Sequence, residues 1–183
     1  MTTPKLLAVV GTKKSGKTTV VEHIVSRLTR KGFRIGSIKH IHHPDFTIDS
    51  EGTDTWRHAK TGSGIVAALS KNETTLIIKD GLESTLPPAP SFMMNQGHDM
   101  NVIEGLHSSI GQRTDIFKVI TAHDPEDLKE RINNTVPPIV AISGVVAEKA
   151  NSLPDNNVSV INAMTDSAKL IEKIENEVLR LKN

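Results

Sequence analysis

The chain has 183 residues, of which 37% are hydrophobic, and its 22 basic and 21 acidic residues leave a formal charge of +1. This length favours a single domain with a substantial core. The balanced charge and an aromatic content of 3% argue against a nucleic-acid surface. Without cysteine, disulfides, thiolate metal sites and cysteine nucleophiles are excluded. No apolar run reaches the ~20 residues that span a bilayer and no leader pattern opens the chain, so we expect a cytoplasmic protein without a membrane partner.

Strand and helix patterns alternate along the first half of the chain, which is typical of a parallel sheet. The pattern predicts, in order, a strand at Lys5–Gly11, a helix from Lys17 to about Lys31, a strand at Phe33–Lys39, a short helix at Thr55–Thr61 with Asp54 as N-cap, and strands at Gly64–Ser70 and Glu73–Lys79. The last two strands are separated by a short turn, and we expect them to form a β-hairpin.

The second half of the chain opens with an irregular stretch at Asp80–His98, where three prolines forbid a continuous helix. The pattern then predicts strands at Asp99–Glu104, Ile116–Thr121, Pro138–Ser143 and Val158–Asn162, a helix from the N-cap Asp124 to about Asn133, and a final helix capped by Thr165 or Asp166, with Ala168, Ile171, Ile174, Val178 and Leu181 on one face. The expected fold is therefore α/β, with a mostly parallel sheet flanked by helices and a β-hairpin extension.

A complete phosphate-binding loop lies between the first strand and the first helix: residues 11–18 read Gly-Thr-Lys-Lys-Ser-Gly-Lys-Thr. A strand that feeds a glycine turn and then a helix aims several backbone N–H groups at one point. We expect Lys17 to reach the β- and γ-phosphates and the Thr18 hydroxyl to ligate Mg²⁺. The expected nucleotide contacts come from Gly11, Thr12, Lys13, Lys14, Ser15, Gly16, Lys17, Thr18 and Thr19. The chain is thus predicted to have the P-loop NTPase fold, with residues 1–183 as one nucleotide-binding domain.

A phosphate-loop enzyme needs a second acidic group at the end of a neighbouring strand, where it holds Mg²⁺ directly or through water. Glu104 is the best candidate, because it ends an apolar strand and Gly105 lets the chain turn close to the phosphates. Asp99 lies ~16 Å away at the other end of this strand and is interpreted as structural. Asp80 is the alternative acid, and Mg²⁺ ligands from elsewhere remain a third possibility.

The polar loop at Lys39–Asp49 contains three His and two Asp. It follows the second strand, so in a parallel sheet it emerges at the ligand-binding edge. His42, His43 and Asp49 are candidates to bind a metal, orient a phosphate or act as acid and base. The alternative is a polar surface loop. Arg57, on the short helix beyond, is expected to pair with a phosphate or with Asp54.

The base of the nucleotide is not specified by a motif, because the guanine-reading pattern Asn-Lys-x-Asp does not occur in this chain. Ser143 and Gly144 follow the last core strand at the ligand edge, and are candidates to approach a purine ring. Residues 112–115, Gln-Arg-Thr-Asp, favour a solvated turn.

Together, residues 9–19, the Ile-Lys-His-Ile-His-His run at 38–43, residues 52–62 and the Glu104-Gly105 pair resemble the molybdopterin-guanine dinucleotide biosynthesis protein B (MobB) family. The resemblance implies a small GTP-binding protein with weak GTPase activity that acts beside the guanylyltransferase of molybdenum cofactor synthesis. It also implies a homodimer, for which the hairpin at 64–79 is a candidate surface. The prolines at 87–90 depart from the family pattern.

We therefore expect GTP and Mg²⁺ as ligands, with Lys17 and Glu104 in catalytic roles and with Thr18 and Glu104 at the metal. The loop with His42, His43 and Asp49 would sense the γ-phosphate or meet a molybdopterin-bearing partner. Without an identifiable arginine finger, hydrolysis is expected to be slow. The alternatives are a metal-insertion GTPase that uses the His40–His43 cluster, a small-molecule kinase with Arg113 on a lid, and a regulatory adaptor without chemistry of its own.

Overall fold

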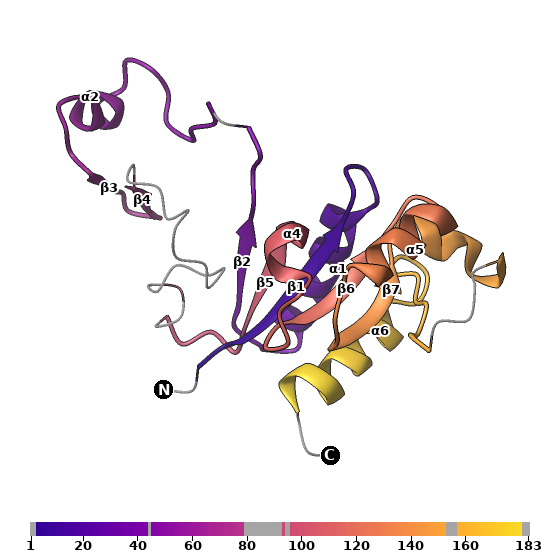
Figure 1. The fold of residues 1–183 in the computed structure, drawn as a ribbon. Coiled ribbons are helices and arrows are strands. Elements are labelled where there is room, and N and C mark those ends of the chain that lie inside the picture. Colours follow the sequence, from indigo (N-terminus) through magenta and orange to yellow (C-terminus); the bar gives the residue numbers. More distant parts are fainter. Residues whose placement is uncertain (1–2, 44, 79–92, 94–95, 153–156, 181–183) are drawn as a thin grey trace. The chain divides into compact units, whose positions relative to one another are not determined.

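The computed structural model describes residues 3–43, 45–78, 93, 96–152 and 157–180 (Figure 1). Contacts divide the chain into two compact units: Met1–His40 together with Ser91–Asn183, and Ile41–Pro90. Each unit is described by itself. The first contains the phosphate-binding loop, and the interpretation of the whole chain as one nucleotide-binding domain stays a prediction. No helix among the described residues is long and apolar enough to cross a membrane.

The first unit is built on a five-stranded sheet in which every pair of neighbouring strands is parallel. In spatial order the strands are β2 (Ile35–Lys39), β5 (Met100–Glu104), β1 (Lys5–Gly11), β6 (Phe117–Thr121) and β7 (Ile139–Ser143). The expected α/β fold is confirmed, and the predicted strand positions agree with these bounds to within two residues.

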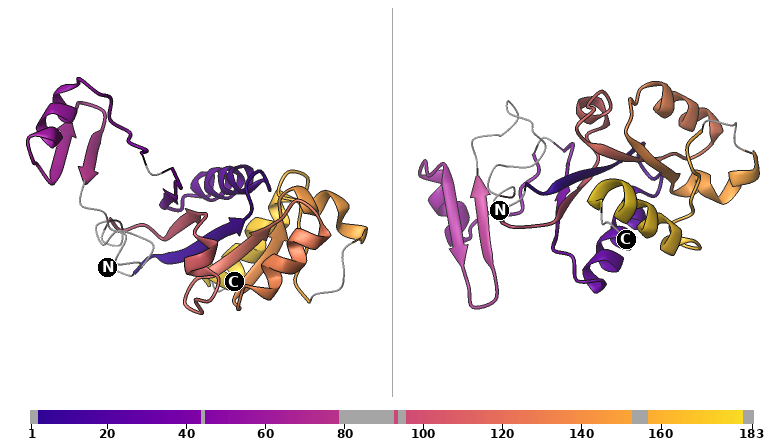
Figure 2. Two further views of the ribbon diagram at one scale, coloured as in Figure 1. Left: turned by 45° about the horizontal axis from the view of Figure 1, so that its top comes forward. Right: turned by 90° about the horizontal axis from the view of Figure 1, so that it is seen from below.

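Alternation along β1 sends side chains to two separate cores, as the two-residue period of a strand requires. Leu7 and Val9 contribute to one core, and Ala8 and Val10 to the other. The first core is covered by α1 (Lys17–Arg30) and by α6 (Ser167–Ile174) with its π-helical continuation η3 (Glu175–Leu179); the second by α4 (His107–Ile110), α5 (Pro125–Asn133) and the 3₁₀ helix η2 (Val145–Ser152). Helices therefore cover both faces of the sheet, as the views in Figure 2 show.

Local signals place the helix ends of the first unit. The Asp124 side chain accepts hydrogen bonds from the backbone N–H groups of Glu126 (3.0 Å) and Asp127 (2.9 Å), and Pro125 opens α5, so the predicted cap is confirmed. Of the two candidate caps for α6, Asp166 is the one at the N-cap position. Asp99 accepts a hydrogen bond from the Arg34 backbone N–H (2.7 Å) at the amino end of the sheet, which agrees with a structural role.

Three expectations in the first unit were wrong. Residues 158–162 do not form a strand of the sheet, because Val160 makes only an isolated parallel bridge with Ile142. The short helix α4 lies between two predicted strands, where no helix was predicted. In the final helix Ile171, Ile174 and Val178 are buried as predicted, but Ala168 is exposed and Leu170 is buried in its place, so the face toward the core was wrong at this position. The calls on Leu181, Asp80 and residues 87–90 fall outside the described residues.

The second unit contains α2 (Asp54–Lys60), β3 (Ile65–Leu69) and β4 (Thr74–Ile78). The two strands pair antiparallel, so the predicted hairpin is confirmed. The N-cap of α2 is Thr53, whose hydroxyl accepts a hydrogen bond from the Trp56 N–H (3.2 Å), and not Asp54 as predicted. The helix therefore begins one residue earlier than expected.

The carboxyl ends of β1 and β5 lie side by side, with Val9 opposite Glu104 in the register. The chain leaves β1 toward α1 on one face of the sheet and leaves β5 toward α4 on the other. Neighbouring strands whose connections part in this way leave a crevice at the carboxyl edge, which is where α/β sheets bind ligands.

Candidate functional site

The phosphate-binding loop runs from Gly11 at the end of β1 to Gly16 before α1. Glycine is required at position 11, because a Cβ there would lie 2.1 Å from the Thr121 carbonyl oxygen. No side chain caps α1. The first N–H groups of a helix have no intrahelical partner, so the start of α1 offers backbone donors toward the loop, together with the positive end of the helix dipole.

Lys17, the first residue of α1, folds back over the loop, and its ammonium donates a hydrogen bond to the Thr12 carbonyl oxygen. Burial lowers the pKa of Lys17 below its ordinary value; the nearby Glu104 carboxylate opposes this shift, and the positive charge of Lys39 adds to it. Lys17 therefore lies in a partly desolvated site with a second cation and an anion close by.

Thr18 and Glu104 come together at the crevice, as predicted for a magnesium site. The Thr18 hydroxyl donates a hydrogen bond to Glu104 Oε1 at 2.8 Å, and Glu104 is only 7% exposed. A buried carboxylate next to a threonine hydroxyl is an all-oxygen donor pair of the kind Mg²⁺ prefers. These two residues therefore fit the ion, although their role as ligands stays a prediction.

Lys39 is a part of this cluster that the sequence analysis did not single out. It ends β2 directly beside Glu104 in the register, and its ammonium forms an ion pair with the same Oε1 atom. In the sequence, only its place in the 38–43 run that resembles the MobB family pointed to a role for Lys39. Two lysines, 17 and 39, thus bring positive charge to one buried carboxylate at the ligand edge.

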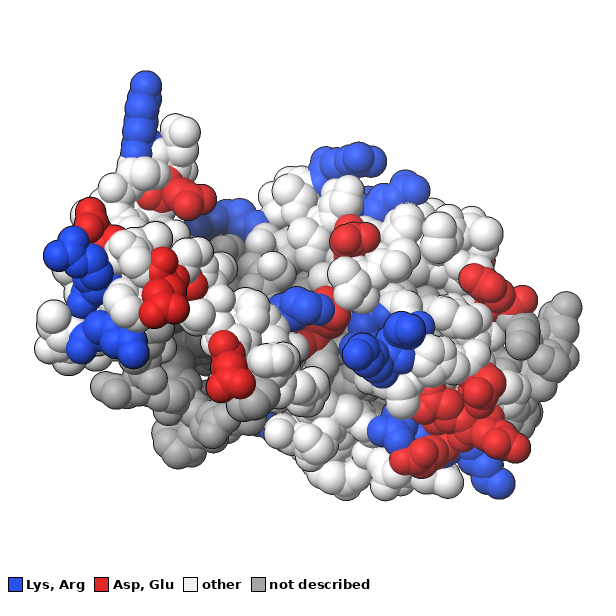
Figure 3. All heavy atoms as spheres, turned by 90° about the horizontal axis from the view of Figure 1, so that it is seen from above, with Lys and Arg blue, Asp and Glu red and all other residues white. Residues whose placement is uncertain are grey.

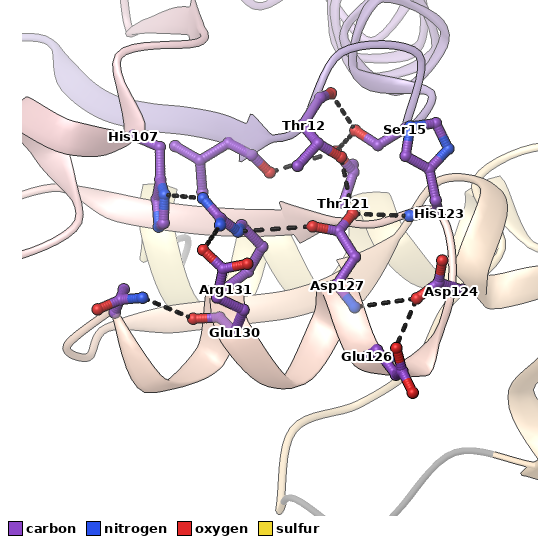
Figure 4. A network of polar contacts seen from close by, with 12 residues as sticks. Thr12, Ser15, His107, Thr121, His123, Asp124, Glu126, Asp127, Glu130 and Arg131 are labelled. Carbon is purple, nitrogen blue, oxygen red and sulfur yellow. Dashed lines mark hydrogen bonds and ion pairs between the residues drawn. The ribbon is translucent and has the colours of Figure 1, made fainter.

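The phosphate-binding loop is also held by Thr121, at the end of β6, and by residues that follow this strand (Figure 4). The Thr12 hydroxyl donates to Asp127 Oδ2 at 2.7 Å, and the same oxygen accepts from the His123 backbone N–H at 3.0 Å. Ser15 and Thr121 share a buried hydroxyl–hydroxyl hydrogen bond of 2.6 Å. These contacts fix the loop before a nucleotide arrives, and they were missed because Asp127 looks like an ordinary acidic residue in a helix's first turn.

A cavity of about 80 Å³ adjoins the start of α1. It is lined by two residues of the predicted nucleotide contacts, Gly16 and Thr19, and by Val20, Gly144, Val145, Glu148, Asn162, Ala163 and Met164. Gly144 packs directly on the loop, since a Cβ there would lie 2.2 Å from the Ser15 carbonyl oxygen. The segment after β7 that was expected to approach a purine therefore borders the phosphate-binding loop.

His42, His43 and Asp49 belong to the second unit, so their expected contribution to the phosphate site stays a prediction. Both histidines are exposed. Asp49 Oδ1 accepts hydrogen bonds from the hydroxyls of Thr53 and Thr55, each at 2.8 Å, and so shapes the start of α2. Among the described residues, no group of three or more His, Cys, Asp or Glu is placed to hold a metal ion.

Two arginines, for which the sequence left both a functional and a structural interpretation, lie in ion pairs. Arg57 pairs with Asp54 at 3.5 Å on the surface of α2. Arg113 donates through Nε to Asp115 at 2.8 Å, and this hydrogen bond raises the pKa of Arg113 and lowers that of Asp115. The geometry therefore favours the structural interpretation of both arginines.

The parallel sheet, the glycine turn at the end of β1 and the acidic residue that ends β5 together define the P-loop NTPase fold. A family model described as "Molybdopterin guanine dinucleotide synthesis protein B" (MobB) matches residues 6–142. The chain belongs to the MobB family, and the resemblance noted in the sequence is confirmed.

Curated relatives carry related names. The chain is 30% identical over 125 residues to the molybdopterin-guanine dinucleotide biosynthesis adapter protein of Escherichia coli (strain K12), a match that covers 67% of this chain and 71% of the relative. It is 41% identical over 104 residues to the protein of the same name from Haemophilus influenzae, covering 55% of this chain and 56% of the relative. The second match thus spans little more than half of that relative.

Solved structures share the fold. The crystal structure of Bacillus subtilis MobB has a TM-score of 0.71 and 23% identity to this chain. The match covers 91% of this chain and 93% of the Bacillus subtilis chain. The structure of a MobB protein homolog from Bacillus stearothermophilus has a TM-score of 0.64 and 20% identity to this chain. The match covers 97% of this chain and 99% of the homolog. At these identities the likeness concerns the fold.

Proposed function

We propose that this protein binds GTP with Mg²⁺, hydrolyses it slowly, and acts in the cytoplasm as an adapter in molybdopterin guanine dinucleotide biosynthesis, beside the guanylyltransferase. The observation that carries the nucleotide site is the convergence of Lys17, Thr18 and Glu104 where β1 and β5 end. The adapter role is supported by the names of the relatives.

The triphosphate is held by the loop from Gly11 to Thr19. The proposed donors to it are the backbone N–H groups at the start of α1 and the Lys17 ammonium, which lies over the loop at the Thr12 carbonyl, and each hydrogen bond to an anionic phosphate oxygen is charge-assisted. Lys17 exchanges its present acceptor, the Thr12 carbonyl, for a phosphate oxygen. Lys13 and Lys14 add positive charge at the rim of the loop.

Thr18 and Glu104 hold Mg²⁺, since their oxygens already lie 2.8 Å apart and Glu104 is buried. When bound, the ion neutralises negative charge on the phosphates. Lys39 stabilises the buried Glu104 carboxylate, which would otherwise be costly to desolvate. Lys17 offsets the charge that grows on the γ-phosphate.

Slow hydrolysis is supported by two arginines in the described part of the first unit, each of which already has an acidic partner. Arg113 pairs with Asp115, and Arg131 Nε lies 3.6 Å from Asp127 Oδ1. Comparable nucleotide-binding proteins without an added arginine hydrolyse at about 10⁻⁴–10⁻² s⁻¹. Such a rate suits a protein whose bound state, rather than its turnover, is what a partner detects.

The hairpin of the second unit provides the surface for a homodimer. Ile65 is opposite Ile78 and Ala67 is opposite Leu76 in the register, so these side chains share one face. Ile65, Leu76 and Ile78 are exposed on it, and an exposed apolar face of this kind marks an interaction surface. The loop with His42, His43 and Asp49 senses the γ-phosphate or meets the molybdopterin-bearing partner.

Surface charge is consistent with small-molecule and protein partners. On the face drawn in Figure 3, basic and acidic side chains occur side by side, in keeping with the formal charge of +1. Nucleic-acid binding needs a surface with a strong excess of basic side chains.

Titration calorimetry with GTP, GDP and ATP, with and without Mg²⁺, tests the proposal. We expect GTP–Mg²⁺ to bind, and Lys17→Ala to weaken it about 100-fold, because a charge-assisted contact to each of two phosphates is lost. Lys129→Ala, which removes an exposed lysine from α5, is the matched control and should bind as the wild type does. Unchanged GTP affinity in Lys17→Ala would contradict the proposed site.

A further inference from the structure

We propose that the cavity beside α1 receives the base of the nucleotide and that Glu148 makes guanine the preferred base. This inference rests on the proposed nucleotide binding and extends it to the choice of base. It assigns contact with the base to the segment after β7 and to Asn162, although the sequence contains no base-reading motif there.

The position of the cavity fits the path of a nucleotide. Gly16 and Thr19 line it and also belong to the phosphate-binding loop and the first turn of α1. A nucleoside attached to phosphates in that loop must leave along one side of the helix start. Gly144, which also lines the cavity, lies against Gly16 and the Ser15 carbonyl, so the cavity is continuous with the loop.

The walls of the cavity are suited to a flat ring. Among the described residues of the first unit, Val145 and Met164 are the only large apolar side chains that are exposed, at 36% and 66%, and both line this cavity. Val20 and Ala163, which also line it, are buried. A volume of about 80 Å³ accommodates several water molecules, and a base that displaces them would cover the two exposed apolar side chains.

Glu148 supplies the group that distinguishes guanine from adenine. It is exposed on η2, and its carboxylate has no hydrogen-bond or ion-pair partner among the described residues. A carboxylate only accepts hydrogen bonds. Guanine offers it two adjacent donors, N1–H and the N2 amino group, whereas adenine presents the lone pair of N1. A bidentate contact of this type discriminates between bases by about 10- to 100-fold.

Asn162 complements Glu148. Its Oδ1 atom accepts a hydrogen bond from the Met164 backbone N–H at 2.9 Å, which turns the amide so that Nδ2 remains as a donor. Guanine carries an acceptor, O6, where adenine carries an amino group. One acceptor and one donor on the cavity wall therefore match the guanine edge and mismatch the adenine edge.

Competition binding with GTP, ATP, XTP and inorganic tripolyphosphate, each with Mg²⁺, tests this inference. The variants are Glu148→Gln and, as a matched control, Glu126→Gln, which removes an exposed carboxylate from α5. We expect the wild type to prefer GTP over ATP by at least about 10-fold. Glu148→Gln should lose most of that preference, bind tripolyphosphate unchanged, and bind XTP more tightly than the wild type does, because a glutamine amide donates to the O2 that replaces the guanine amino group.

A second variant separates the position of the base from its recognition. Met164→Ser should weaken GTP and ATP by the same factor of about 3 to 10, because it removes apolar contact with any purine, and leave tripolyphosphate unchanged. If the wild type binds tripolyphosphate and GTP but Glu148→Gln keeps the GTP preference, the inference is overturned and the phosphate site stands. If the wild type binds neither ligand, the proposed function fails as well.

Discussion

The two units of this chain differ in where their apolar side chains lie. In the first unit, large apolar side chains fill a core on each face of the sheet. In the second unit, Val66 is the only buried side chain among the described residues. Large apolar side chains are exposed there instead: Ile41, Phe46, Ile48, Ile65, Leu69, Leu76 and Ile78. The first unit therefore has a core of its own beside the proposed nucleotide site, whereas the second exposes an apolar surface, which is the proposed site of association.

The largest expected effect tests whether stability resides in the first unit. Ile24→Ala, on the buried side of α1, should lower the free energy of unfolding by about 2–5 kcal/mol, because it leaves a cavity in the first core. Val66→Ala removes two methyl groups from β3 and should cost about 2 kcal/mol or less. Urea unfolding followed by circular dichroism measures both. Equal losses of unfolding free energy in the two variants would contradict the inference that stability resides in the first unit.

The next effect concerns the buried acid at the nucleotide site. Glu104→Gln keeps the size of the side chain but removes the charge that Thr18 and Lys39 contact. We expect GTP hydrolysis to fall about 100-fold, because an electrostatic group at the phosphates is lost, and GTP affinity to depend less on Mg²⁺. A phosphate-release assay measures the rate.

The matched control for this change lies on the same strand segment. Asp99→Asn alters a carboxylate just before β5, at the amino end of the sheet, where it contacts the Arg34 backbone. Hydrolysis should be unaffected by it. A Glu104→Gln protein with the wild-type rate and Mg²⁺ dependence would remove Glu104 from the site and reopen Asp80 as the acid.

The third effect tests the surface of the second unit. Leu76→Asp places a charge on the exposed face of the hairpin and should weaken a homodimer at least about 10-fold, because the carboxylate would have to be desolvated. Nucleotide affinity should not change. Sedimentation equilibrium measures the association, with Lys71→Ala in the hairpin turn as the control. A wild-type protein that stays monomeric at high concentration would refute this surface.

Sequence patterns predicted the sheet and the phosphate-binding loop well, because both follow from local rules. The apolar run before Gly11, the helical spacing after Lys17 and the Asp124-Pro125 start of α5 each specify their own geometry. The pairing of Thr18 with Glu104 was also foreseen, since parallel strands bring their carboxyl ends to one edge.

Contacts that depend on tertiary packing were not foreseeable in the same way. Asp127 holds Thr12 across 115 positions in the sequence, and nothing near Asp127 marks it as different from other first-turn acids. Lys118 in β6 is fully buried and donates to the Arg113 carbonyl, although a lysine in a strand is expected at the surface. The failed strand at 158–162 has the right composition but meets its neighbour at a single bridge.

The smallest expected effect is a pH dependence that belongs to the first unit. His107 Nδ1 accepts a hydrogen bond from Arg131 at 3.1 Å (Figure 4). The ring proton therefore lies on Nε2, which is 2.8 Å from the Thr135 hydroxyl. Burial lowers the pKa of His107 below its ordinary value, and the positive charge of Arg131 adds to the shift. The folded protein therefore binds fewer protons here than the unfolded chain does.

It follows that the contribution of His107 to stability is complete above its ordinary pKa and is lost as the pH falls through the lowered value. His107→Gln should cost about 0.5–1.5 kcal/mol at pH 7.5 through a lost hydrogen bond, and less at pH 5.5, so its unfolding free energy should vary less with pH than that of the wild type. Urea unfolding at the two pH values measures this, with His58→Gln on the exposed α2 as the control. A His107→Gln cost that grows on acidification would show that the fold stabilises the protonated ring, in which both nitrogens carry protons, and would contradict the acceptor role of Nδ1 toward Arg131.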